Sequence, residues 1–318
     1  MIFDVFNGDA DGICALHQLR LAEPAESELV TGVKRDIGLL KRVAAQAGDR
    51  VTALDITVEK NLAALQPMLA RGVKVRWFDH HNPGELPVHA GFEPHIDTAA
   101  DVCTSLIVDR HLGGAYRTWA VAAAFGDNLH EAARRAAEPL NLDPARIAAL
   151  QELGECLNYN AYGDSVDDLY FHPADLYRRL HDYVDPFAFI AEAPEFARLK
   201  AGYAEDMKLA EETLPYVENP SGAVFVLPDA AWARRVSGVY ANALATAHPD
   251  RAHALVTRSP NGFYVVSVRA PVNNRIGADT LCMRFDGGGG RKAAGGINNL
   301  PVERLDDFVQ AFYEIYPD

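Results

Sequence analysis

The stretch Asp79-His80-His81 combines a carboxylate with two imidazoles, side chains that bind divalent metals and transfer protons. An apolar, β-prone run at 73–78 leads into it, and Asn82-Pro83-Gly84 follows it. Proline removes a ladder donor and glycine permits an unusual turn, so the strand must end here. The three side chains therefore lie where a strand meets a loop, the edge at which open α/β sheets bind ligands. A polar turn with two exposed histidines is the alternative.

Two further acidic sites follow predicted strands. Asp9 and Asp11 lie in a glycine-flanked loop after the strand at 2–6, so both carboxylates can turn toward one point. Asp55 follows the strand at 50–54. The alternative for the first pair is an Asx-type turn in which Asp11 is the N-cap of the next helix. Because parallel strands end at the same edge of a sheet, acids after successive strands favour one shared site over independent turns.

The first half of the chain alternates β-prone runs with helical patterns. This alternation predicts an α/β fold: a mostly parallel sheet with right-handed crossovers and helices on both faces. Helices are also expected at 102–111 and 118–125, and the second ends at Gly126-Asp127, where Asp127 is another acidic candidate or only a turn residue. The expected strands are 2–6, 28–31, 50–54 and 74–78, and the expected helices between them are 13–22, 38–47 and 59–70.

The second half predicts a smaller α/β unit. The pattern is helical from 131 to 181 and from 194 to 214, and 218–222 has the composition of a linker. Strands are then expected at 223–227, 252–257 and 263–269, and helices at 230–247 and 302–316. We therefore expect a metal-binding catalytic domain at 1–192, a linker helix and loop at 193–219, and a substrate-binding domain at 220–318.

A run of glycines beside two cations marks the second domain. Small residues let backbone N–H groups approach a phosphate, and arginine and lysine suit phosphate oxygens. The alternative is a flexible turn. The candidate substrate-binding residues are Arg269, Gly288, Gly289, Gly290, Arg291 and Lys292.

Composition excludes some classes of partner. The 318 residues carry 30 Lys and Arg against 44 Asp and Glu, a formal charge of −14 that argues against a general grip on long nucleic acid. Four cysteines without a Cys-x-x-Cys pair are typical of a reduced, cytoplasmic protein without structural zinc. We expect no signal peptide and no membrane segment. A homodimer is compatible with the sequence.

These residues together resemble the DHH phosphoesterase superfamily, in its subgroup with a C-terminal DHHA1 domain, which includes nanoRNase-like and oligoribonuclease-like phosphodiesterases. The similarity covers nearly the whole chain, and five motifs in the same order and spacing carry it. They are Asn7-Gly8-Asp9-Ala10-Asp11-Gly12, Asp55, Asp79-His80-His81, Gly126-Asp127 and the run from Gly287 to Gly295, with Ser267-Val268-Arg269 similar to an arginine strand of DHHA1.

The resemblance implies a centre with two divalent metals, usually Mn²⁺, with Mg²⁺ or Co²⁺ as alternatives. One ion would be held by Asp9 and Asp55 with Asn7 beside them, and Asp55 would bridge to the other. It also implies that His81 lies beside the scissile phosphate and that catalysis depends on His81, Asp55 and Asp79. The implied metal ligands are Asn7, Asp9, Asp11, Asp55, His80 and Asp127.

Two positions depart from the family pattern. The family usually has histidine where this chain has Asn7, and an amide oxygen is a weaker ligand than an imidazole. The glycine motif usually continues with histidine where this chain has Gly290, and Arg291 is a candidate substitute. Both departures bear on metal binding and on contact with the substrate phosphate.

The expected function is a metal-dependent phosphodiesterase that converts short nucleotide substrates, nano-oligoribonucleotides or linear dinucleotides such as pGpG, to mononucleotides. An exopolyphosphatase-like or pyrophosphatase-like phosphohydrolase is one alternative, because no clear aromatic cluster for a base accompanies the glycine run. A catalytically weakened protein that only binds nucleotide is another, because of the departures at Asn7 and Gly290.

Overall fold

The computed structural model describes residues 1–317. The chain forms two compact units, one from Met1 to Ala201 and the other from Gly202 onward. Helix α9 (Pro194–Glu211) begins in the first unit and ends in the second, within the segment expected as a linker. None of the described helices has the length and apolarity that crossing a bilayer would require.

A parallel five-stranded sheet in the order β2-β1-β3-β4-β5 forms the centre of the first unit. Its register places Phe6 opposite Leu54 and Leu54 opposite Phe78, so the carboxyl ends of β1, β3 and β4 meet at one edge. The strands are β1 (Ile2–Phe6), β2 (Glu28–Val30), β3 (Arg50–Leu54), β4 (Lys74–Asp79) and β5 (Phe92–Ile96).

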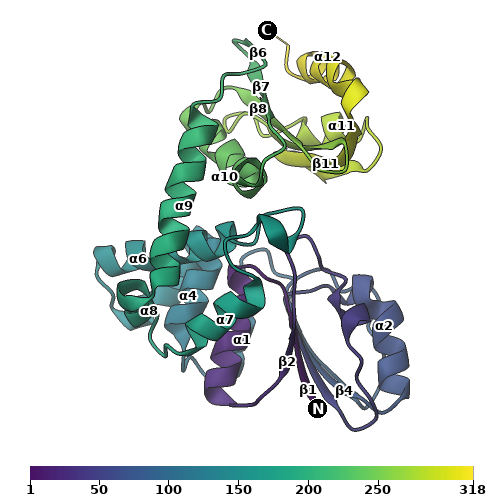
Figure 1. The fold of residues 1–318 in the computed structure, drawn as a ribbon, viewed down its shortest axis with the longest axis vertical. Helices are drawn as coiled ribbons and strands as arrows, with labels where there is room; N and C mark the ends of the chain where they lie inside the picture. The colour runs from purple at the N-terminus through teal and green to yellow at the C-terminus, as the bar shows by residue number, and fades with distance from the viewer. Residues whose placement is uncertain (318) are drawn as a thin grey trace. The chain divides into compact units, whose positions relative to one another are not determined.

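Both faces of this sheet are buried. Successive side chains of a strand point to opposite faces, so Phe6 joins one hydrophobic cluster and Val5 the other. The first cluster includes α1 (Ala10–Ala22) and α4 (Arg117–Gly126), and the second includes α2 (Val58–Ala70). Figure 1 shows α1, α4 and α7 on one side of the strands and α2 on the other. The expected parallel sheet with helices on both faces is confirmed.

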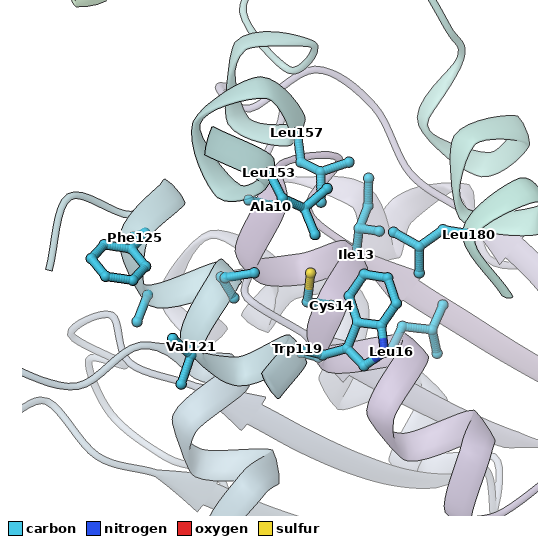
Figure 2. Close-up of a cluster of buried hydrophobic side chains, with 14 of the residues drawn as sticks. Ala10, Ile13, Cys14, Leu16, Trp119, Val121, Phe125, Leu153, Leu157 and Leu180 are labelled. Atoms are coloured by element: carbon cyan, nitrogen blue, oxygen red, sulfur yellow. The ribbon is translucent and has the colours of Figure 1, made fainter. Parts of the chain in front are cut away.

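The first cluster is a helical layer in which α1 and α4 pack closely together (Figure 2). Glycine makes the approach of α4 to α6 (Pro144–Tyr159) possible. A Cβ on Gly126 would lie 2.7 Å from the Gly154 carbonyl oxygen, and one on Gly154 would lie 2.0 Å from the Ala122 carbonyl oxygen. The residues that Figure 2 labels are Ala10, Ile13, Cys14, Leu16, Trp119, Val121, Phe125, Leu153, Leu157 and Leu180.

The helix predicted at 38–47 is wrong, since only a short 3-10 turn, η1 (Leu39–Arg42), forms there. Asn61 on α2 takes the place of helical hydrogen bonds: its Oδ1 accepts from the Leu40 N–H at 2.9 Å and its Nδ2 donates to the Ile37 carbonyl at 2.7 Å. Tertiary hydrogen bonds therefore outweigh local helix propensity in this segment.

The other helices of the first unit complete its layers. They are α3 (Thr104–His111), α5 (His130–Ala137), η2 (Glu138–Leu140), η3 (Val166–Asp168), α7 (Pro173–His181) and α8 (Pro186–Glu192).

The second unit is a mixed six-stranded sheet in the order β10-β11-β9-β8-β7-β6, in which only β7 and β8 pair in parallel. Its strands are β6 (Val217–Asn219), β7 (Gly222–Leu227), β8 (Ala252–Arg258), β9 (Phe263–Arg269), β10 (Gly288–Arg291) and β11 (Ala294–Pro301). Its helices are α10 (Ala231–Ala247), α11 (Ala278–Cys282), η4 (Val302–Arg304) and α12 (Leu305–Ile315). The expected smaller α/β unit is confirmed.

A buried histidine makes the first unit sensitive to acid. His17 on α1 donates from Nε2 to the Tyr183 carbonyl at 2.9 Å, and burial, then the neighbouring His181, lowers the pKa of His17 to about 3. Below pH 6.5 His17 binds a proton in the unfolded chain but stays neutral in the folded chain. The free energy of unfolding therefore falls as the pH drops toward 3.

We expect wild type to lose about 2 kcal/mol more unfolding free energy than His17→Gln between about pH 7 and about pH 4.5. Urea unfolding at both pH values measures this, and His89→Gln, at an exposed position, is the control. An equal loss in wild type and His17→Gln would contradict the prediction.

Candidate metal centre

Asp9 and Asp11 hold different positions at the start of α1. Asp9 is the N-cap, and its Oδ1 accepts from the backbone N–H groups of Asp11 and Gly12 at 3.0 Å each. The alternative with Asp11 as N-cap is therefore wrong. Asp11 instead accepts from the backbone N–H groups of Thr104 and Ser105 at 2.7 Å each, at the beginning of α3. Helix α3 thus fixes this carboxylate.

Asp55 follows β3 in the left-handed region, with φ 59°. Aspartate adopts this region more readily than most residues, and such conformations concentrate at functional sites. The Asp55 N–H donates to the Phe78 carbonyl at 3.0 Å, and its Oδ1 accepts from the Thr104 hydroxyl at 3.1 Å. The side chain is therefore turned from β3 toward the end of β4, where the histidines lie.

His80 faces two carboxylates through a single nitrogen. Its Nδ1 lies 2.8 Å from the Val102 carbonyl, which can only accept, so Nδ1 carries a proton. Nε2 then lies 3.5 Å from Asp55 Oδ1 and 3.6 Å from Asp127 Oδ2. In a neutral imidazole, Nε2 carries a lone pair that points at these two carboxylate oxygens. This arrangement is favourable only if a cation lies between the nitrogen and the oxygens. A backbone carbonyl that fixes the other nitrogen is also typical of a metal-binding histidine.

His81 is paired with a buried aspartate. Its Nδ1 donates to Asp79 Oδ1 at 2.7 Å, and its side chain is 43% exposed. Burial would lower the pKa of His81, but the hydrogen bond and charge of Asp79 outweigh burial and raise it. The proton on Nδ1 stays with the pair, so Nε2 is the atom that can exchange a proton with a ligand.

The carboxyl groups crowd each other. Burial, and then the charges of Asp9, Asp11 and Asp127, raise the pKa of Asp55 well above its ordinary value. Burial and the charge of Asp127 raise the pKa of Asp11. Carboxyl groups gathered in this way need cations to ionise together, which is the electrostatic basis of a divalent metal site.

One of these cations belongs to the protein. Lys34 Nζ donates to Asp9 Oδ2 at 2.5 Å and to Asp127 Oδ1 at 3.2 Å. Burial opposes the ionisation of both groups, but their mutual attraction outweighs burial. The pKa of Asp9 is therefore below its ordinary value, and the pKa of Lys34 is well above its ordinary value. Sequence reasoning missed Lys34. It lies in the loop after β2, beyond the strand's end at Val30, and no local pattern distinguishes this lysine as a partner of the carboxylates.

The residues present fit a divalent ion. Among the described residues, two groups of side chains each offer ligand atoms within 4.8 Å of one another. The groups are Asp11, His80 and Asp127, and Asp55, His80 and His81. Oxygen and imidazole ligands suit Mn²⁺ and Mg²⁺. Asp9 belongs to neither group.

Asn7, the sixth expected ligand, lies at the end of β1 and is 3% exposed. Its Nδ2 donates to the Lys34 carbonyl at 3.2 Å. Its Oδ1 has no hydrogen-bond partner among residues 1–317, so it is a buried oxygen available to a ligand.

In the second unit, the glycine run is a strand. Gly288–Arg291 forms β10, which pairs with β11 at the edge of the sheet. Gly290 has φ 141°, and a Cβ there would lie 2.5 Å from the Ala294 carbonyl oxygen, so histidine at 290 would not fit this backbone. Ala294 pairs with both Arg291 and Arg269, which places the two arginines in one row across three strands.

Arg269 is supported by α10, since its Nε donates to Asn242 Oδ1 at 2.6 Å. Arg291 and Lys292 are exposed. These three cations therefore lie near the β10–β11 hairpin, and their binding to a phosphate stays a prediction. Gly288 and Gly289, the other candidates, belong to β10, whose position at the edge leaves one side of its backbone unpaired in the sheet.

Comparison with solved structures identifies the fold. An exonuclease RecJ bound to manganese matches with a TM-score of 0.62 and 18% identity, over 100% of this chain and 90% of that one. RecJ from Thermus thermophilus in complex with Mn²⁺ matches with a TM-score of 0.59 and 17% identity, over 98% of this chain and 51% of that one. A pGpG-specific phosphodiesterase, PggH from Vibrio cholerae, matches with a TM-score of 0.55 and 15% identity, over 98% of both chains.

No protein-family model matches the sequence, and no curated protein matches it significantly. The structural matches extend over nearly the whole chain although fewer than one residue in five is identical. Together with the parallel sheet and the second mixed sheet, they show that the chain has a DHH-like fold, which it shares with RecJ and the Vibrio cholerae protein.

Proposed function

We propose that the protein is a metal-dependent phosphodiesterase that hydrolyses short nucleotide substrates to mononucleotides. The observation that carries the proposal is the position of His80, whose Nε2 faces Asp55 and Asp127 at 3.5 and 3.6 Å while Val102 fixes its other nitrogen. An imidazole and converging carboxylates, held rigidly by backbone groups, are the environment of a catalytic divalent ion.

A divalent ion bound there would neutralise phosphate oxygens and activate water. The protein supplies the rest. Asp11, tied to the start of α3, and Asp55, turned by its left-handed backbone, would hold the ion in place. His81 Nε2 would donate a proton to the leaving oxygen, while Asp79 keeps the imidazole oriented through Nδ1.

The preference for short substrates rests on charge and on one structural relative. The formal charge of −14 does not provide a long basic track, whereas Arg269, Arg291 and Lys292 suffice for a single phosphate. The Vibrio cholerae protein, which matches over 98% of both chains, is a pGpG-specific phosphodiesterase. RecJ is an exonuclease, so a longer strand is the main competing substrate.

Removal of metal tests the proposal first. We expect hydrolysis of a linear dinucleotide to fall to background after chelation and to return with Mn²⁺, because the carboxylates cannot activate water without a cation. Release of mononucleotides measures the activity, with polyphosphate assayed in parallel. Full turnover in chelated protein would reject the mechanism, and hydrolysis of polyphosphate alone would reject the nucleotide substrate.

Substrate length and Arg269 provide a second test. We expect the rate to fall as oligonucleotides lengthen from two to about twenty nucleotides, beyond the few-nucleotide footprint of a small site. Arg269→Ala should raise KM about 10-fold or more for a dinucleotide with a terminal phosphate, and less for one without it. Arg258→Ala, at an exposed position on β8, is the control. Rates that rise with length would indicate an exonuclease.

A further inference from the structure

Lys34 occupies a position inside the acidic site that is built for an ammonium group. An ammonium has three donors. The structure provides three oxygens for Nζ: Asp9 Oδ2 at 2.5 Å, Asn158 Oδ1 at 3.0 Å and Asp127 Oδ1 at 3.2 Å. The Tyr162 ring lies 5.9 Å from Nζ and adds an aromatic face. All three N–H donors of the Lys34 ammonium therefore have acceptors within the site.

The backbone and the neighbouring groups fix this arrangement. The Lys34 N–H donates to the Ala161 carbonyl at 2.9 Å, and the Lys34 carbonyl accepts from Asn7 Nδ2 at 3.2 Å. Asn158 Nδ2 lies 3.3 Å from the Tyr162 hydroxyl, so the amide directs its oxygen at Lys34. The side chain of Lys34 is 28% exposed, which places the ammonium among carboxylates rather than in bulk water.

The remaining ligand atoms suffice for one ion. Both groups of candidate ligands contain His80, whose Nδ1 is hydrogen-bonded to the Val102 carbonyl, so Nε2 is the nitrogen of His80 available to an ion. Asp9 uses Oδ1 as the N-cap of α1, and its Oδ2 pairs with the charged ammonium of Lys34, whereas the two oxygens of Asp11 accept from neutral backbone N–H groups. A second divalent ion at Asp9 would lie against the ammonium, where like charges repel.

We propose that this protein binds one divalent ion, and that the ammonium of Lys34 takes the place of a second. This inference rests on the metal centre of the proposed function. It does not depend on which substrate the protein hydrolyses. Lys34 then neutralises Asp9 and Asp127 permanently, and the divalent ion is held by Asp11, Asp55, His80 and Asp127.

Metal stoichiometry without substrate tests the inference. Chelated full-length protein is titrated with Mn²⁺ by calorimetry, and the bound metal is counted by elemental analysis after desalting. Electron paramagnetic resonance then separates an isolated Mn²⁺ from an exchange-coupled pair. We expect wild type to bind one Mn²⁺ per chain with the spectrum of an isolated ion.

Removing the ammonium should create the second site. We expect Lys34→Met to bind two Mn²⁺ per chain and to show exchange coupling, because Asp9 Oδ2 and Asp127 Oδ1 become free for a metal. Lys34→Gln provides the same test if Lys34→Met does not fold, which thermal unfolding of the metal-free protein would show. Lys41→Met, which removes an exposed lysine charge from η1, should still bind one ion.

Each result decides the question. Two ions or none in wild type would overturn the inference, and so would a single ion in the folded Lys34 variants. One ion in wild type and two in a Lys34 variant would support it. The outcome is separate from the proposed function, because a protein that binds one Mn²⁺ and hydrolyses no nucleotide would refute the function while leaving the metal count unchanged.

Discussion

Replacing Asp55 should abolish activity more completely than any other single change in the site. We expect Asp55→Asn and Asp55→Ala to lower kcat for Mn²⁺-dependent hydrolysis of a dinucleotide by about 10³-fold or more. Asp55 Oδ1 lies 3.5 Å from His80 Nε2 and 4.0 Å from His81 Nδ1, so its charge acts on the metal ligand and on the proton donor at once. Initial rates at saturating Mn²⁺ measure the effect.

The two substitutions separate charge from backbone strain. Asn tolerates the left-handed conformation that Asp55 adopts at φ 59°, whereas Ala pays about 1 kcal/mol there. Both variants should lose activity, and only Asp55→Ala should suffer this added strain. Asp101→Ala, whose side chain is 65% exposed, is the control and should keep its rate. Near-normal turnover in Asp55→Asn would remove this residue from the mechanism.

Breaking the buried ion pair between α1 and β1 should cause the largest loss of stability. Arg20 donates from Nε to Asp4 Oδ2 at 2.8 Å and from Nη2 to Asp4 Oδ1 at 2.6 Å, and the side chains of Arg20 and Asp4 are 6% and 0% exposed. Arg20→Met leaves the Asp4 charge buried, and among residues 1–317 the Ser27 hydroxyl then remains as its side-chain donor, at 2.6 Å. We expect a loss of about 3–5 kcal/mol in unfolding free energy by urea denaturation.

Removing both charges should restore much of this loss. Asp4→Leu/Arg20→Met has no buried charge left without a partner, so it should be more stable than Arg20→Met. The exposed pair Arg178–Asp175 on α7 is the comparison, and Arg178→Met should cost about 0.5 kcal/mol or less. A double variant no more stable than Arg20→Met would show that packing of the arginine side chain, not its charge, stabilises the helix.

Much of the acidic edge was predictable from the sequence. Alternating strands and helices require a parallel sheet, and residues that directly follow parallel strands must meet at one edge. Asp9 and Asp55 obey this rule after β1 and β3, and His80 obeys it after β4. The resemblance of five motifs to the DHH superfamily implied a DHH-like fold, and the structural matches confirm that fold.

The cation of the site could not be predicted from local pattern. Lys34 lies in a loop. Its partners are Asp9 at the start of α1, Asp127 at the end of α4 and Asn158 on α6, and they lie far from Lys34 in the sequence. Only the packing of these helices determines that an ammonium, rather than water or a metal, meets Asp9. Charge pairing over such separations depends on tertiary distance, which sequence spacing does not contain.

Backbone conformation was likewise decided by tertiary pairing. The segment at 38–47 has a helical composition, but Asn61 supplies hydrogen bonds from another helix and limits it to one 3-10 turn. The glycine run is compatible with a flexible turn, yet pairing with β11 makes Gly288–Arg291 a strand. The sequence by itself determined the order of elements and the acids at their ends, because these depend on local periodicity. The tertiary structure alone decided which groups share hydrogen bonds and charge, because those depend on contacts between residues far apart in the chain.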